Sequence, residues 1–115
     1  MNKTRFAALL ALAMTTGSAL ATEAGSDPEA FKQKLQACGA CHGENGDKPL
    51  APEYPILAGQ QADYIAAALR HYRDGRRNNP IMGAQIQALQ LTEQDIVALG
   101  DYFSRQKGPL AALKK

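Results

Sequence analysis

The sequence predicts an all-α fold, and three observations support this prediction. Apolar residues recur at helical spacing in three separate segments of the chain. Residues typical of helix starts and stops, such as Asp-Pro, Thr and Gly, flank these segments. No segment shows the alternation of apolar and polar residues that a half-buried strand requires. With 115 residues, the chain is long enough for one domain.

The first residues have the composition of a secretory signal peptide. Lys3 and Arg5 precede an apolar run at residues 6–14, and an Ala-x-Ala cleavage pattern ends at Ala21. The run is too short to span a bilayer, which takes about 20 residues, so a membrane anchor is the less favoured alternative. We therefore expect residues 1–21 to be a signal peptide and residues 22–115 to form a domain in the periplasm.

The charge balance of the chain excludes some classes of partner. The formal net charge is +2, and Lys3 and Arg5 of the predicted leader account for it, so the domain is near neutral. A near-neutral domain lacks the basic excess of a protein that binds nucleic acid or a membrane surface. We expect no nucleic-acid partner and no stable membrane insertion.

Residues 38–42 read Cys-Gly-Ala-Cys-His, a C-x-x-C-H sequence that is typical of c-type haem attachment. Each thiol can form a thioether bond to a haem vinyl group, and the adjacent imidazole can bind the iron. Positions i, i+3 and i+4 lie on one face of a helix, so Cys38, Cys41 and His42 can reach the same planar ligand. The predicted cofactor is therefore one covalently bound haem c.

The first predicted helix leads into this motif. Asp27 is a suitable N-cap, Pro28 suits the first helical position, and the helix is expected over residues 28–41. Its apolar stripe consists of Phe31, Leu35 and Cys38. Residues 43–58 then show no helical or strand period. A loop of this length is unusual in so small a domain unless it packs on a cofactor.

Further helices are expected in the second half of the chain. Residues 60–74 form a helical pattern, and a short helix is expected over 83–88 within an otherwise irregular region. Thr92 begins the last helix, which Gly108 and the following proline end. Residues 110–115 are expected to be a loose basic tail.

An electron-carrying haem iron needs a sixth ligand that excludes small molecules. Outside the predicted leader the chain contains one methionine, Met82, and one further histidine, His71. Met82 lies in a segment expected to be a loop, which can place a thioether over the iron, and ligation by His and Met raises the reduction potential. We favour Met82 as the distal ligand. The alternatives are His71 as the ligand, or Met82 as a core residue.

The order of these features resembles the class I cytochromes c. The motif at 38–42 is followed by Pro-x-Leu-x-Gly at 55–59, then Met82, then a C-terminal helix with Tyr102 and Phe103. More narrowly, the chain resembles one half of the bacterial tandem di-haem cytochromes c or their single-haem relatives. The resemblance implies a small class I cytochrome c fold, with about four helices and loops wrapped around one covalent haem.

The resemblance also implies roles for individual residues. The two cysteines of the motif would carry the thioether bonds, with His42 as proximal ligand and Met82 as distal ligand. The Pro55 carbonyl would orient the His42 ring, and Leu57 would pack on the haem. The first and last helices would cross.

Together these features predict an exported monohaem cytochrome c that carries one electron at a time and is not an enzyme. Its partners would be redox proteins, with a dehydrogenase or cytochrome complex as donor and an oxidase or reductase as acceptor. We expect a monomer or weak dimer. The alternative function is a haem sensor or redox subunit with an open distal site. Less favoured alternatives for the cysteines are a disulfide, a thiol–disulfide oxidoreductase and a zinc site.

Four arginines form the densest basic patch of the sequence: Arg70, Arg73, Arg76 and Arg77. A solvated helix end is the favoured interpretation for Arg70 and Arg73, since cations suit a helix C-terminus. Arg76 or Arg77 could instead reach a haem propionate or help to dock a partner. The sequence leaves these alternatives open.

Overall fold

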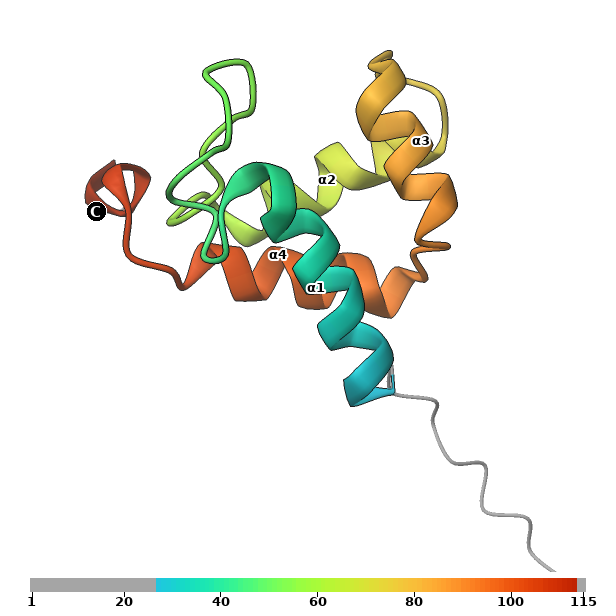
Figure 1. The fold of residues 1–115 in the computed structure, drawn as a ribbon, viewed down its shortest axis with the longest axis horizontal. Coiled ribbons are helices and arrows are strands. Elements are labelled where there is room, and N and C mark those ends of the chain that lie inside the picture. Colours follow the sequence, from blue (N-terminus) through green and yellow to red (C-terminus); the bar gives the residue numbers. More distant parts are fainter. Residues whose placement is uncertain (1–26, 114–115) are drawn as a thin grey trace, which may run out of the picture.

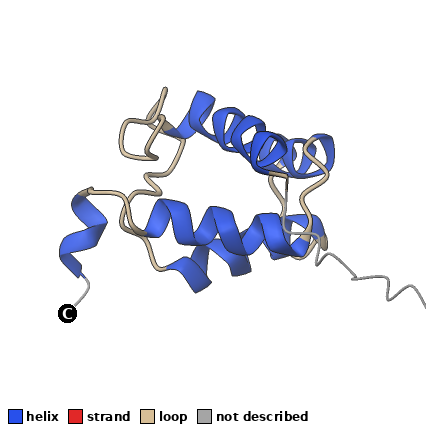
Figure 2. Cartoon of the chain, turned by 90° about the horizontal axis from the view of Figure 1, so that it is seen from below, coloured by secondary structure: helices blue, strands red, loops and turns tan. Residues whose placement is uncertain are grey.

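The computed structural model describes residues 27–113, which form four α-helices and one 3₁₀ helix (Figure 1). The elements are α1 (Pro28–His42), α2 (Ala62–Arg73), α3 (Pro80–Ala88), α4 (Glu93–Ser104) and the 3₁₀ helix η1 (Pro109–Leu113). Between residues 27 and 113 there is no strand, as Figure 2 shows. The all-α prediction is confirmed. The signal peptide expected at residues 1–21 lies outside the described residues.

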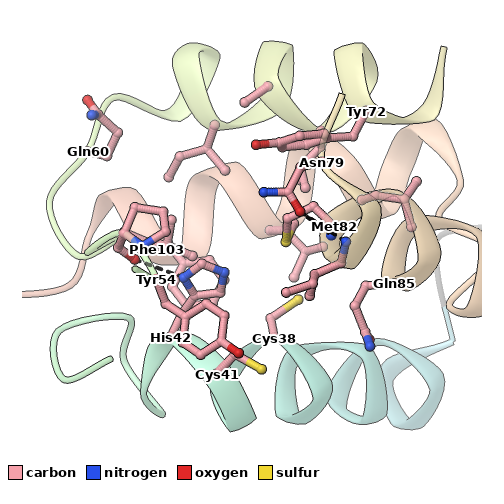
Figure 3. Close-up of a pocket in the computed structure, with 18 of the residues that line it drawn as sticks. Cys38, Cys41, His42, Tyr54, Gln60, Tyr72, Asn79, Met82, Gln85 and Phe103 are labelled. Carbon is pink, nitrogen blue, oxygen red and sulfur yellow. Dashed lines mark hydrogen bonds between the residues drawn. The ribbon is translucent and has the colours of Figure 1, made fainter. Parts of the chain in front are cut away.

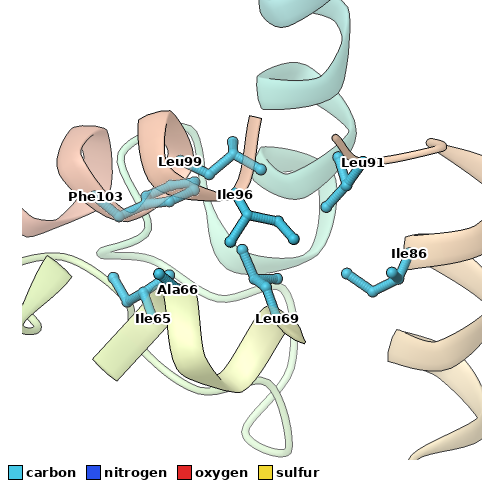
Figure 4. Packing of buried hydrophobic residues seen from close by; sticks show 8 residues of the cluster. All are labelled: Ile65, Ala66, Leu69, Ile86, Leu91, Ile96, Leu99 and Phe103. Carbon is cyan, nitrogen blue, oxygen red and sulfur yellow. The ribbon is translucent and has the colours of Figure 1, made fainter. Parts of the chain in front are cut away.

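Helices α2 and α4 pack against each other and supply most of the core (Figure 4). The buried apolar cluster consists of Ile65, Ala66 and Leu69 of α2, Ile86 of α3, Leu91, and Ile96, Leu99 and Phe103 of α4. Burying an apolar side chain of this size contributes about 1.5–3 kcal/mol. Helix α1 adds Phe31 and Leu35, which are partly buried against the cluster. In Figure 1, α1 crosses α4, as the resemblance implies.

A buried ion pair joins α1 to the start of α4. The Asp95 side chain is 1% exposed, and Lys34 Nζ donates to its Oδ2 at 2.5 Å. The same oxygen accepts hydrogen bonds from the backbone N–H and the hydroxyl of Thr92, each at 2.8 Å, and the Asp95 N–H donates to Thr92 Oγ1. This capping box begins α4. A buried carboxylate needs such partners to offset the cost of its desolvation. Because Lys34 belongs to α1 and Asp95 to α4, this ion pair fixes where α1 packs on α4.

Helix α3 begins earlier than the sequence analysis predicts, at Pro80 instead of residue 83. Asn79 is its N-cap, and the Asn79 side-chain oxygen accepts hydrogen bonds from the N–H groups of Ile81 and Met82, each at 3.0 Å. Met82 therefore lies in the first turn of a helix, and its expected placement in a loop is wrong. Asparagine at the N-cap followed by proline at the first helical position is a helix-start signal. The apolar residues of this short segment recur too weakly to predict the helix by their spacing.

The C-terminal segment also differs from the expected loose tail. Helix α4 ends at Ser104, and residues 109–113 form η1. This segment lies against the loop before α2, where a Cβ built on Gly59 would clash with the backbone nitrogen of Ala111. The Gly59 N–H donates to the Phe103 carbonyl at 2.9 Å. Contacts between distant parts of the sequence order this tail, so its own composition could not predict the structure.

Gly46 anchors the long loop between α1 and α2. Its φ of 72° is in the left-handed region, and its carbonyl accepts hydrogen bonds from the N–H groups of Leu57 and Ala58 at 2.8 and 3.0 Å. A Cβ at this position would lie 2.8 Å from Phe103 Cδ1 and 2.9 Å from Leu57 Cβ. Glycine therefore allows the segment that includes Leu57 to fold closely against α4.

Replacing Gly46 by alanine is expected to destabilise the protein more than the same change at Gly75. Both glycines have a φ of 72°, so both changes share a backbone cost of about 1–2 kcal/mol. A Cβ on Gly75 meets nothing within 4 Å. At Gly46, overpacking against these contacts should reduce the free energy of unfolding by roughly a further 1–3 kcal/mol. Denaturant unfolding of the haem-loaded variants measures the difference, and equal losses would contradict this packing argument.

Arg70 and Arg73 of α2 are partly solvated, and they also bridge to α4. Glu93, in the first turn of α4, accepts a hydrogen bond from Arg70 Nε at 2.8 Å and another from Arg73 Nη1 at 3.2 Å. The hydrogen bond from Arg70, with that from Arg73, holds the pKa of the Glu93 carboxyl below its ordinary value of 4.5. The interpretation of these arginines as a solvated helix end is therefore incomplete.

A Glu93→Gln variant is expected to lose a small part of the stability at pH 7, because the glutamine carries no charge to pair with Arg70 and Arg73. A carboxyl whose pKa is lowered on folding stabilises the fold above its ordinary value of 4.5. That stabilisation disappears as the pH falls through the lowered pKa. The melting temperatures of variant and wild type should therefore converge in acid and in high salt.

The exposed Glu44, which forms no ion pair with a described residue, offers a control. Glu44→Gln should change the melting temperature little at any of these pH values. A gap between wild type and Glu93→Gln that stays constant from neutral to acidic pH would contradict the proposed source of the stabilisation.

Candidate functional site

A cavity of about 360 Å³ lies between α1, the loop before α2, and helices α2 and α3 (Figure 3). It brings together all the site residues that the sequence analysis singles out: Cys38, Cys41, His42, Pro55, Leu57 and Met82. The remaining walls are mainly apolar. Core residues such as Leu69, Leu99 and Phe103 contribute to them. The cavity is thus continuous with the hydrophobic core of the domain.

His42, the last residue of α1, is held in one orientation. Its side chain is buried, and its Nδ1 lies 2.8 Å from the Pro55 carbonyl oxygen. A carbonyl can only accept a hydrogen bond, so Nδ1 carries the proton and Nε2 of the neutral ring keeps a lone pair. Figure 3 shows this second nitrogen directed into the cavity. The contact is the one that the resemblance implies, and it prepares Nε2 to bind a metal.

The two cysteines lie one turn apart on α1, both half-buried and both free thiols. Burial raises the pKa of the Cys38 thiol to about 11. Catalytic cysteines need a lowered pKa, because the thiolate is the nucleophile. A thiol–disulfide oxidoreductase therefore gains no support, and neither does a structural disulfide.

Met82 enters the cavity from α3, on a different wall from His42 (Figure 3). Its backbone N–H is held by the Asn79 side chain at 3.0 Å, so the start of the helix fixes where the thioether projects. His71, the alternative ligand, is not among the described residues that line the cavity. The imidazole and thioether that the sequence analysis pairs as ligands therefore meet in one space.

The residues of this cavity fit a haem. A cavity this large and apolar, at the centre of so small a domain, would be a serious packing defect in an ordinary core. A haem has a flat apolar body that suits such walls. The donor set of one imidazole, one thioether and two adjacent thiols matches the ligands and attachment groups of c-type haem iron.

Sequence reasoning missed several polar residues of the same cavity. Tyr54 lies edge-on to the His42 ring, with centroids 6.2 Å apart. The sequence analysis assigns no role in the site to Tyr72 or Asn79 and leaves the role of Arg77 open. All of them line the cavity. Only the helix-capping pattern of Asn79 is a signal that a sequence carries; the others depend on tertiary placement.

Two further features concern the part of the chain that the structure describes. Within residues 27–113, no three or more histidine, cysteine or acidic side chains are grouped so as to hold a metal ion, so a zinc site gains no support. None of the helices in this range is long and apolar enough to cross a membrane.

Comparisons with known proteins agree with this geometry. Residues 17–107 match the family model of cytochrome c. Cytochrome c4 of Stutzerimonas stutzeri is 36% identical over 115 residues, an alignment that covers 94% of this chain and 52% of the relative. Cytochrome c-554(548) of Halomonas halodenitrificans is 39% identical over 84 residues, with 70% of this chain and 98% of the relative covered.

A protein named thiosulfate dehydrogenase electron acceptor, from Thiomonas intermedia, is 38% identical over 96 residues, which cover 84% of this chain and 43% of that protein. The chain spans about half the length of the cytochromes c4 that it matches. The family match covers most of the sequence and includes the C-x-x-C-H motif. The chain therefore belongs to the cytochrome c family, as a class I c-type cytochrome related to the di-haem cytochromes c4, with covalently bound haem c as its cofactor.

Proposed function

We propose that this protein is a monohaem electron carrier, with the haem attached to Cys38 and Cys41 and the iron held between His42 and Met82. The observation that carries the proposal is the single apolar cavity into which both cysteines, the imidazole and the thioether project. The haem supplies the one-electron chemistry, between ferric and ferrous iron. The polypeptide supplies ligation, burial and a surface for docking.

The surrounding residues would keep the iron ligands in place in both oxidation states. The Pro55 carbonyl, 2.8 Å from Nδ1, fixes the tautomer and ring plane of His42 and makes Nε2 a better donor to the metal. Asn79 fixes the backbone at Met82. Leu57, in the loop anchored by Gly46, lines the cavity and would help to exclude water from the haem. Little rearrangement would then accompany electron transfer.

Export and partners are part of the same proposal. Residues 1–21 would be removed as a signal peptide, and residues 22–115 would act in the periplasm without stable membrane insertion, as a monomer or weak dimer. The donor would be a dehydrogenase or a cytochrome complex, and the acceptor an oxidase or reductase. The relative from Thiomonas intermedia that is named for accepting electrons from thiosulfate dehydrogenase supports a dehydrogenase as donor.

Met82→Ala tests the ligand assignment. We expect the ferric variant to lose the weak absorption band at the red end of the spectrum that reports methionine ligation. The reduction potential should fall by roughly 0.1 V or more, within the ~0.8 V range that axial ligands span. The ferrous variant should bind carbon monoxide, which the wild type should exclude. Optical spectroscopy and a redox titration measure all three effects.

His71→Ala is the matched control, because His71 is the one other described histidine and does not line the cavity. It should leave the spectrum and the potential unchanged. If Met82→Ala left the ferric spectrum unchanged instead, the distal site would be open or differently ligated. A haem sensor or redox subunit would then be the better interpretation.

A further inference from the structure

The C-terminal part of the chain packs on the segment that carries the Pro55 carbonyl. Residues 108–113, which we call the C-terminal strap, comprise Gly108 and the 3₁₀ helix η1. Figure 1 shows η1 at the C-terminal end of the ribbon, beside the loop that leads into α2. The family match ends at residue 107, so the strap lies just beyond it. None of the described residues that line the cavity belongs to the strap. The strap can therefore influence the site only through the segment on which it packs.

Two glycines make this contact close. A Cβ built on Gly59 would lie 2.8 Å from both the Cα and the Cβ of Ala111, so the two segments touch at the backbone. A Cβ built on Gly108 would lie 2.8 Å from the Ala58 Cβ and 2.9 Å from the Ala58 carbonyl oxygen. Ala58 itself is fully buried. Because the contacts are so short, even one added methyl group would force the strap and the loop apart.

Backbone hydrogen bonds hold the same segment, residues 57–59. The N–H groups of Leu57 and Ala58 donate to the Gly46 carbonyl at 2.8 and 3.0 Å. The Gly59 N–H donates to the carbonyl of Phe103, in the last turn of α4, at 2.9 Å. The strap begins only four residues after α4 ends. The end of α4 and the strap thus hold the same segment, the helix by a hydrogen bond and the strap by packing.

The position of residues 57–59 determines the position of the Pro55 carbonyl. Pro55 lies two residues before Leu57, and its carbonyl oxygen is 2.8 Å from Nδ1 of His42. Pro55 is exposed, so packing around the residue itself does little to hold this carbonyl in place. A movement of residues 57–59 away from α4 would therefore lengthen the hydrogen bond that orients the imidazole.

We propose that the C-terminal strap positions the proximal ligand, by holding the Pro55 carbonyl against His42 through residues 58–59. Gly108 and Ala111, which make the contact, are positioning residues because neither lines the cavity. A carbonyl that accepts from Nδ1 fixes the ring and makes its other nitrogen a better donor to a metal. The strap would keep that arrangement in both oxidation states. The proposal rests on the proposed ligation of the haem iron by His42, but not on the identity of the distal ligand.

Gly108→Val in the haem-loaded protein tests the proposal. The φ of Gly108 is not positive, and the residue before a proline favours the extended backbone that valine also prefers, so the change adds little backbone strain. The new side chain must displace Ala58, to which even a Cβ is too close. The measurement is the rate at which the Nδ1 proton of His42 exchanges with deuterium, followed by NMR of the reduced protein. Because exchange requires a local opening that breaks the hydrogen bond to Pro55, we expect it to be roughly tenfold faster in the variant. The proton resonance should also move upfield, because a longer hydrogen bond deshields the proton less.

Two control variants separate positioning from a general loss of stability. Ala112→Val also places a valine in the strap, but at an exposed position, and it should change the exchange rate less than about twofold. Ile96→Val deletes a methyl group from the core between α2 and α4, at a residue that does not line the cavity, and so weakens the whole domain. It should lower the melting temperature and leave the resonance of the His42 ring proton and its exchange rate nearly unchanged, because the local opening does not involve this core.

The proposal is overturned if Gly108→Val exchanges the ring proton at the wild-type rate or leaves its resonance in place, or if Ile96→Val accelerates exchange equally. If Gly108→Val does not mature, Gly108→Ala carries the test, because its single methyl group already meets Ala58. We then expect exchange to be about threefold faster. These outcomes leave the proposed function standing when the wild type contains covalent haem. A wild-type protein without covalent haem would overturn both proposals.

Discussion

The domain depends on an apolar cavity enclosed by the same residues that make its core. Leu69, Leu99 and Phe103 face this space and also belong to the cluster that joins α2 to α4. A chain with so small a core has little stability to spare, so a large apolar cofactor is a structural component as much as a functional one. Folding and haem binding are therefore coupled, and a change that loosens the cavity should weaken both.

Polar contacts at the edges give this cavity its geometry. The Pro55 carbonyl orients His42, Asn79 holds the start of α3 and with it Met82, and the Lys34–Asp95 pair docks α1 on α4. Each contact joins residues on different elements or fixes a helix end. The two proposed ligands are thus positioned by rigid elements and by hydrogen bonds that are already formed, which would keep the reorganisation on electron transfer small.

Local signals predicted much of this structure. Asp27 and Thr92 begin helices as expected, and the spacing of Cys38, Cys41 and His42 by itself predicts haem attachment. The errors arose where distant residues decide the outcome. Contacts with the Gly59 loop order the C-terminal tail. The start of α3 was missed because capping by Asn79, and not an apolar period, begins it. No local pattern could have placed Tyr72 in the site.

In the function that we propose, one iron lies between His42 and Met82 in this cavity. X-ray absorption at the iron edge of the purified wild-type protein tests it directly, in both oxidation states. We predict a six-coordinate iron with one sulfur ligand and five nitrogen ligands, unchanged in number on reduction. An iron without a sulfur ligand, or one that loses a ligand on reduction, would contradict the claim.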